Sequence, residues 1–198
     1  MPSGGPQATQ RALERAAGAR AVVLVEGLSD QIALETLATR HGRTLADEGV
    51  LVVPIGGAQA IGRFLARFAD LKLAGLCDVG EEDVFRRALE RAGFGTRLTR
   101  RGMERLGFHV CVVDLEDELI RAHGATGVEA VLDAYGDLGA FRTFQKQPAW
   151  RGQSVESQLR RFMGSADRRK LRYARLLVEA LELARVPRPL RGVLASVT

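Results

Sequence analysis

The 198-residue sequence has few of the side chains that hold small extracellular proteins together. It contains only two cysteines, Cys77 and Cys111, each inside an apolar run. The spacing C-x-x-C is absent, which argues against a zinc knuckle or a thioredoxin-like motif. The three histidines, at positions 41, 109 and 123, stand apart with no partner at ligand spacing. We expect structural or surface roles for all five side chains.

Long apolar stretches are also missing. No segment reaches the roughly 18 apolar residues of a membrane span, and residues 1–20 lack the apolar centre of a secretory signal. We therefore expect a cytoplasmic protein in a reducing compartment, without a membrane partner. Hydrophobic residues make up 46% of the chain and charged residues 27%, so an ordinary globular core can form without disulfide bonds or structural metal ions.

Charge is distributed unevenly along the chain. The net charge is +5, but residues 1–140 hold 16 basic and 20 acidic residues, whereas residues 141–198 hold 13 basic and 4 acidic ones. An acidic centre beside a basic tail suits a metal-using enzyme that acts on a polyanion. A solvated basic surface explains the charge equally well. On the first interpretation, nucleic acid is expected to contact Arg168, Arg169 and Arg172.

Apolar runs alternate with helical periodicity over the first two thirds of the chain. Strands are predicted within 21–27, 49–57, 73–82 and 107–124, each followed by a helix. This order predicts an α/β fold with a mainly parallel four-stranded sheet flanked by helices. The predicted organisation is a flexible segment at 1–18, an α/β core at 19–124 and a basic helical annex at 125–198. The clearest annex helix covers 164–184.

Carboxylates follow three of the four predicted strands. They are Glu26 and Asp30 after the first, Asp78, Glu81 and Glu82 after the third, and Asp114, Glu116 and Asp117 after the fourth. The carboxyl ends of parallel strands meet at one edge of a sheet, so these acids should converge. Packed carboxylates repel one another unless a cation lies among them. Mg²⁺ or Mn²⁺ prefers such oxygen ligands. The alternative for each acid alone is that it caps the next helix.

The segment EGLSD at 26–30 resembles the E-G-x-x-D start of a Toprim domain, the fold of topoisomerases, DnaG-type primases and several nucleases. Toprim domains continue with a strand that ends in D-x-D. Asp78 stands at the first aspartate of that motif, but Gly80 stands at the second. Glu81 or Glu82 would have to supply the missing ligand.

Two later segments narrow the resemblance. VVDLEDELIRAHG at 112–124 and RRKLRYARLLVEAL at 168–181 resemble the D-L-E segment and the late lysine-containing helix of OLD-family (overcoming lysogenization defect) nucleases. The resemblance covers about residues 20–190. It implies metal ligands at Glu26, Asp30, Asp78 and Glu116. It also implies that Lys170 steadies developing charge on a phosphate, a role that lysine chemistry permits. Ser29 is expected to cap the helix that follows it.

The function implied by this resemblance is metal-dependent hydrolysis of DNA phosphodiesters. Glu26 and Lys170 would take part in catalysis, and one or two Mg²⁺ or Mn²⁺ ions would act. The alternative is a catalytically degenerate Toprim module that binds nucleic acid or another protein, and Gly80 favours it. A receiver-like phosphoacceptor domain fits less well, because Glu26 stands alone at its strand end.

OLD proteins normally carry an ATPase domain ahead of the Toprim domain. No G-x-x-x-x-G-K-[ST] motif occurs in this sequence. We therefore expect a free-standing Toprim domain or a fragment of something longer. Its candidate partners besides DNA are a separate ATPase and a second copy of the chain.

Overall fold

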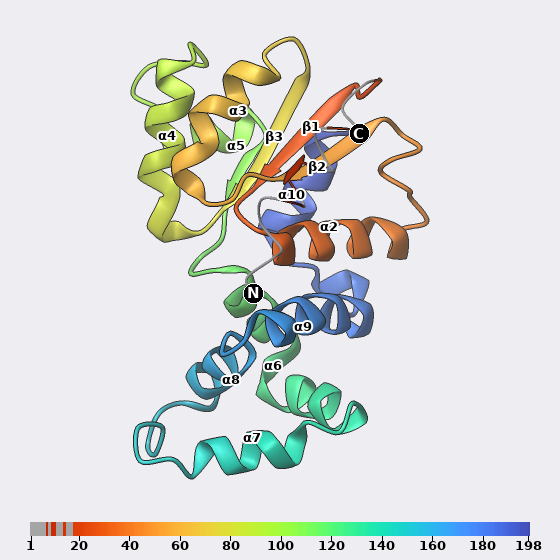
Figure 1. Cartoon of the computed structure of the whole chain (residues 1–198), viewed down its shortest axis with the longest axis vertical. Coiled ribbons are helices and arrows are strands. Elements are labelled where there is room, and N and C mark those ends of the chain that lie inside the picture. Colours follow the sequence, from red (N-terminus) through yellow and green to blue (C-terminus); the bar gives the residue numbers. More distant parts are fainter. Residues whose placement is uncertain (1–6, 8, 11–13, 15–17) are drawn as a thin grey trace.

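The computed structural model describes residues 7, 9, 10, 14 and 18–198, so most of the predicted flexible segment at 1–18 lies outside the described residues. The described strands form one sheet in the order β2-β1-β3-β4, and every neighbouring pair is parallel (Figure 1). The strands are β1 (Ala21–Val25), β2 (Val50–Pro54), β3 (Lys72–Cys77) and β4 (Phe108–Val110). This confirms the predicted α/β class with a four-stranded parallel sheet.

Helices cover both faces of the sheet because its central strands are apolar on both sides. In β1, Ala21, Val23 and Val25 join one hydrophobic cluster, and Val22 and Leu24 join the other, as strand alternation requires. The first face is covered by α2 (Leu28–Arg40) and α10 (Arg188–Ser196). The second is covered by η1 (Ala58–Ala60), α3 (Ile61–Arg67), α4 (Glu82–Arg91) and α5 (Arg100–Arg105). The short η2 (Val79–Glu81) leads into α4.

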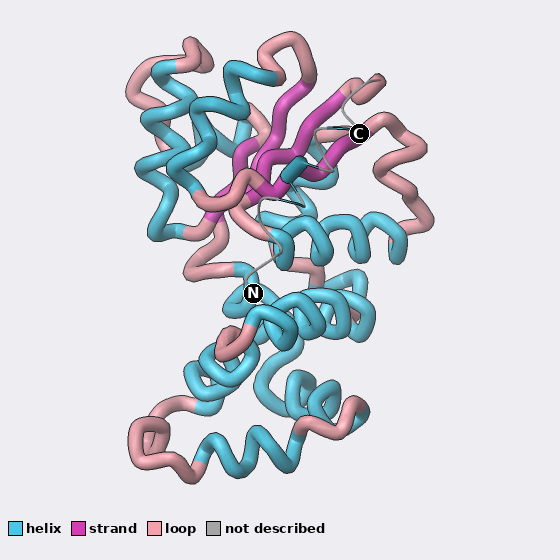
Figure 2. Tube along the Cα trace, viewed as in Figure 1, coloured by secondary structure: helices cyan, strands magenta, loops and turns pink. Residues whose placement is uncertain are grey.

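A second, wholly helical part lies below the sheet in Figures 1 and 2. It contains α6 (Leu115–Ala134), α7 (Leu138–Gln145), α8 (Val155–Met163), α9 (Asp167–Ala180) and η3 (Leu183–Arg185). Helix α6 is broken at Gly124, where φ is 72° and ψ is 160°. Helix α9 packs against α2, which brings this part against the lower edge of the sheet. In the part of the chain that the structure describes, no helix has both the length and the hydropathy needed to cross a bilayer.

The end of the chain departs from the sequence prediction. The helix predicted over 164–184 is shorter, since α9 ends at Ala180, and a further helix, α10, was not predicted. Pro187 is the N-cap of α10 and Pro189 lies in its first turn, where the missing N–H of proline costs nothing. Helix α10 packs against β3 and β4. The chain therefore leaves the sheet through α6 and returns to it through α10.

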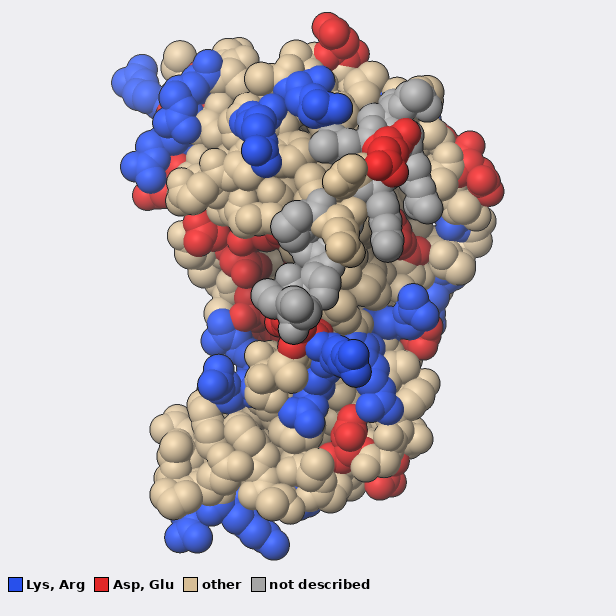
Figure 3. Space-filling model, viewed as in Figure 1, with Lys and Arg blue, Asp and Glu red and all other residues tan. Residues whose placement is uncertain are grey.

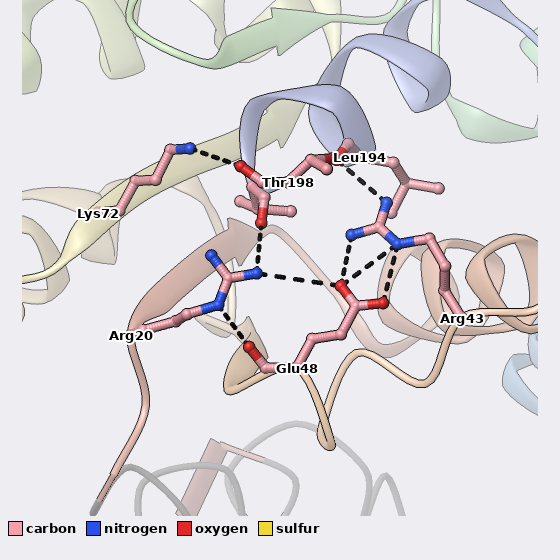
Figure 4. A network of polar contacts seen from close by, with 7 residues as sticks. Arg20, Arg43, Glu48, Lys72, Leu194 and Thr198 are labelled. Carbon is pink, nitrogen blue, oxygen red and sulfur yellow. Dashed lines mark hydrogen bonds and ion pairs between the residues drawn. The ribbon is translucent and has the colours of Figure 1, made fainter.

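A network of polar contacts holds helix α10 against the α/β part (Figure 4). Arg43 donates to Leu194 O over 3.4 Å and forms an ion pair with Glu48. Arg20, just before β1, donates to Val197 O over 3.2 Å, and Lys72, the first residue of β3, donates to Thr198 O over 3.1 Å. Cations at a helix C-terminus complement its dipole. The network therefore holds α10 beside the amino ends of the strands, away from the acidic edge.

Candidate metal centre and active site

The acids that follow β1 and β3 meet at the carboxyl edge of the sheet. Because β1 and β3 are neighbours, Glu26 lies beside the end of β3, and its Oε1 accepts a hydrogen bond from the Asp78 N–H over 2.8 Å. Glu26 is therefore fixed by the sheet itself. Asp78 is partly buried next to it, as the sequence predicted from the parallel order of the strands.

Asp30 is turned back towards the same edge by the start of α2. The N-cap of α2 is Gly27, whose N–H donates to Asp30 Oδ2 over 2.9 Å. The prediction that Ser29 is the cap is wrong, because Ser29 is already inside the helix. The Asp30 carboxylate, at the third helical position, instead accepts from the N–H of the N-cap residue, which is one half of a capping box. Asp30 is only 9% exposed, so it is the most deeply placed carboxylate of the group after Glu116.

Glu116 enters the site from the first turn of α6. Asp114 is the N-cap of this helix and accepts a hydrogen bond from the Asp117 N–H over 2.8 Å. Glu116 is 8% exposed, and its Oε2 lies 3.5 Å from Lys170 Nζ. Its Oε1 is buried and has no hydrogen-bond partner among the described residues. A buried carboxylate oxygen without a donor is costly and is available to a further ligand.

Two cations reach this edge from the helical part. Lys170 in α9 faces Glu116, which brings the lysine named by the OLD resemblance to the carboxylates, while its action on a phosphate stays a prediction. Arg160 in α8 donates from Nε to Asp114 Oδ2 over 2.6 Å. Sequence reasoning missed Arg160, since α8 was not predicted and no local motif marks the residue. Figure 3 shows the resulting pattern, with acidic side chains at the waist of the molecule and basic side chains directly below them.

The remaining predicted site residues lie differently. Glu81 is close enough to Glu26 to raise the pKa of that carboxyl. Glu82 is turned to the surface in an ion pair with Arg100, and it could become a ligand only if that pair opened. Asp117 pairs with Arg121 over 2.7 Å. The positions of these side chains do not decide whether a metal binds to them, so Glu81 and Glu82 remain predicted ligands.

The three arginines predicted to bind nucleic acid are not equally available. Arg169 lies over the Phe162 ring at 4.2 Å and donates to Ser165. Arg172 is paired with Asp137 over 3.0 Å. Arg168 is exposed and has no ion pair in the described part of the chain. Two of the three therefore have structural partners of their own.

Electrostatics show how closely the carboxylates are packed. Burial, reinforced by the charges of Glu26, Asp30, Asp114 and Glu116, raises the pKa of Asp78 to about 8. Burial also raises the pKa of Asp30 to about 7, although the Gly27 N–H and Lys170 oppose the shift. The pKa of Glu26 and that of Glu116 are raised as well, chiefly by burial, and Lys170 opposes both shifts.

Lys170 responds in the opposite sense to the same neighbours. Burial disfavours its charge, but Glu116, Asp30 and Asp78 together outweigh burial and raise the pKa of the ammonium group. One lysine thus offsets part of the repulsion among four carboxylates. The four carboxylates outnumber this one cation, so the cluster can attract a further positive charge.

The donor set fits a hard divalent cation. Every candidate ligand is a carboxylate oxygen, the chemistry that Mg²⁺ and Mn²⁺ prefer, and Glu116 Oε1 is buried with no partner among the described residues. No three His, Cys, Asp or Glu side chains in the described ranges are already arranged as a ligand set. Binding would therefore require some of these side chains to rotate before their oxygens could act as one ligand set.

We expect stability in EDTA to fall between pH 6.5 and 8.5. The folded pKa values of Asp30 and Asp78, about 7 and about 8, lie above the ordinary value of about 3.9. The folded protein therefore binds more protons than the unfolded chain in this range, and stability falls as pH rises. Saturating Mn²⁺ should raise the melting temperature by several degrees, and by more at pH 8.5 than at pH 6.5. Thermal melts with and without metal measure both effects.

Asp78→Asn is the matched variant for these melts. It removes the carboxylate whose pKa is raised to about 8, so its melting temperature in EDTA should depend less on pH and respond less to Mn²⁺. Two other kinds of group contribute at the ends of this range in the wild type and the variant alike. The partly buried histidines have lowered pKa values and add stability as pH rises through about 6.5, and burial raises the pKa of both cysteines, which removes stability as pH rises through about 8.5. A variant with the wild-type pH slope and metal response would contradict the assignment.

Comparison with known proteins agrees with this geometry. Residues 19–77 match the family model of the overcoming lysogenization defect protein-like TOPRIM domain. The C-terminal region of the OLD protein from Xanthomonas campestris pv. campestris is 23% identical, with a TM-score of 0.68 over 92% of this chain and 94% of that one. The corresponding region from Burkholderia pseudomallei is 19% identical, with a TM-score of 0.66 over 90% and 96%. No curated protein matches the chain.

The family model confirms the resemblance inferred from EGLSD, and the segments 112–124 and 168–181 lie outside the residues that it matches. The family model covers the segment from before β1 to the end of β3, and the two structures show that about nine tenths of the chain has the fold of an OLD C-terminal region. TOPRIM domains generally bind divalent metal ions and occur in nucleases and primases.

Proposed function

Since residues 19–77 match the OLD-like TOPRIM domain and the chain has the fold of an OLD C-terminal region, we propose that it hydrolyses phosphodiester bonds of DNA with Mg²⁺ or Mn²⁺. The observation that carries the proposal is the group of four carboxylates at one sheet edge with one lysine against it. Their pKa values are raised and one buried oxygen lacks a partner among the described residues.

In this proposal Glu26, Asp30, Asp78 and Glu116 hold the metal. A bound divalent ion neutralises phosphate charge and lowers the pKa of a water molecule. The residues of the chain orient the carboxylates that would hold this ion. Glu26 is held by the Asp78 N–H and Asp30 by the Gly27 N–H, so both carboxylates are oriented before any ligand arrives. Such preorganisation lowers the cost of reaching the reactive arrangement.

Lys170 is proposed to act on the substrate. Its ammonium group is 3.5 Å from Glu116 Oε2, and its raised pKa keeps it charged at neutral pH. A phosphate held at the carboxylate edge would meet this charge, which stabilises negative charge that develops on the phosphate oxygens. Arg160 holds Asp114 and so fixes the first turn of α6, from which Glu116 projects.

The test is nicking of supercoiled plasmid by purified protein in Mn²⁺, Mg²⁺ or EDTA, with linear, single-stranded and RNA substrates alongside. We expect nicking in either metal and none in EDTA. Nicking that persists in EDTA would contradict the metal mechanism, whereas no cleavage of any substrate would favour the second candidate function.

That second candidate is a catalytically degenerate module that binds nucleic acid or protein. Gly80 favours it, because this glycine stands where the second aspartate of D-x-D is expected. A Cβ built at Gly80 meets nothing within 4 Å, so Gly80→Asp can be accommodated without strain. If the wild type is inactive and Gly80→Asp gains metal-dependent nicking, the natural protein is the degenerate module.

A further inference from the structure

Three neighbouring helices carry matching pairs of exposed arginines. On α3, α4 and α5, which together cover one face of the sheet, two arginines stand four residues apart and point to solvent. We call these six residues the arginine face: Arg63, Arg67, Arg87, Arg91, Arg101 and Arg105. Residues four apart lie on one side of a helix, so each pair presents two guanidinium groups in the same direction. Figure 3 shows the basic side chains over α3 and α4.

Nearby acids offset the charge of the arginine face only in part, since Asp83 interacts with Arg87 without forming an ion pair. No member has a carboxylate at ion-pair distance within the described residues. The nearby acids are occupied elsewhere, since Asp83 pairs with Arg86, Glu82 with Arg100, and Glu104 with Arg188. The six positive charges are therefore left for an external anion.

A structural role explains only half of these residues. Arg67, Arg91 and Arg105 lie in the last turns of their helices, where a cation complements the helix dipole. Arg63, Arg87 and Arg101 lie one turn earlier and gain little from that effect. The guanidinium of Arg63 lies 5.0 Å from the centre of the Phe64 ring, which steadies the side chain while leaving its donors exposed.

The arginine face begins next to the acidic edge. Helix α4 starts at Glu82, directly after Asp78 and η2. At about 1.5 Å per residue, Arg87 lies roughly 7 Å and Arg91 roughly 13 Å along the axis from that start. A DNA duplex carries one phosphate charge for about every 1.7 Å of axis. A duplex that reaches the carboxylates therefore has several further phosphates within range of these helices.

We propose that the arginine face binds the phosphate backbone of the nucleic acid whose scissile phosphate lies at the carboxylate edge. The guanidinium fork suits bidentate contact with phosphate. This inference rests on the proposed function for the identity of its partner. It places the main binding surface on the α/β part, whereas the sequence favoured the basic annex.

The experiment compares two triple variants that each remove three exposed positive charges. Arg63→Gln/Arg87→Gln/Arg101→Gln neutralises the arginine face, and Arg161→Gln/Arg168→Gln/Arg175→Gln neutralises the annex. Binding of a fluorescent 30-base-pair duplex is measured in EDTA over a series of salt concentrations, so that cleavage plays no part. Circular dichroism and thermal melts confirm that both variants are folded.

We expect the face variant to bind about ten- to a hundredfold more weakly near 150 mM salt and to lose about two to three units of the slope of log K against log salt. The annex variant should lose less than threefold. Equal affinity of the face variant and the wild type, a larger loss in the annex variant, or no binding by the wild type would each overturn the proposal. If the wild type binds DNA through this face but cleaves nothing, the proposed binding surface stands and the proposed nuclease function is wrong.

Discussion

Glu26→Gln is expected to reduce metal-dependent plasmid nicking by more than a hundredfold while the protein stays folded. The glutamine keeps the length of the side chain and an oxygen that can still accept the Asp78 N–H, now 2.8 Å from Glu26 Oε1. What the variant loses is one negative charge of the carboxylate cluster. Loss of an outer-shell partner already costs about 10- to 100-fold in metal sites, so loss of a ligand charge should cost more.

The matched control is Glu35→Gln. Glu35 lies on the exposed side of α2, where its carboxylate accepts a hydrogen bond from Gln31, and it takes no part in the cluster. The same chemical change there should leave nicking within twofold of the wild type. Nicking that survives in Glu26→Gln would show that the reaction occurs at another site or belongs to a contaminating nuclease.

Lys170→Met is expected to reduce the maximal nicking rate by about a hundredfold or more, the usual effect of removing one group that stabilises transition-state charge. The variant should also bind metal more tightly. Lys170 now opposes the raised pKa values of Glu26, Asp30 and Glu116, and without it the carboxylates attract a cation more strongly. Nicking rates measured across a Mn²⁺ titration give both quantities.

This metal titration separates two roles of Lys170. If the lysine only balances the carboxylates, saturating Mn²⁺ will restore the wild-type rate in Lys170→Met. If it acts on the phosphate, the rate will stay low at every concentration, and Lys170→Arg, which retains a positive charge, will recover part of it. Lys146→Met removes an exposed annex lysine at the end of α7 and should change the rate less than twofold.

The position of the site could be predicted from the sequence because it depends on chain topology. Glu26 and Asp78 each follow an apolar strand, and a parallel sheet brings such strand ends to one edge. Asp30 was also placed correctly, one turn into the helix that follows EGLSD. The cap was not, because the N-cap of α2 is Gly27, two residues before the predicted cap Ser29, and the Gly27 N–H donates to the Asp30 carboxylate.

Contacts between distant segments could not be predicted. Arg160 reaches Asp114 across 46 residues, and Glu82 is drawn away by Arg100, 18 residues later. Neither pair leaves a local signal in the sequence. The basic annex illustrates the same limit, since Arg169 and Arg172 look available in the sequence but are held by Phe162 and Asp137. Charge counts predict where cations are abundant and do not show which of them are already paired.

The path of the chain through the helical part also determines when the site can form during synthesis. The sheet and its carboxylates are encoded by residues 21–116, but Lys170 is made about fifty residues later, and α10, which seals β3 and β4, follows last. Helix α9 packs against α2, which is made more than a hundred residues earlier, so the lysine joins the acidic edge only when α9 docks on the α/β part. A growing chain therefore carries an acidic edge without its lysine, and the complete site exists only once almost all of this sequence has been translated and folded.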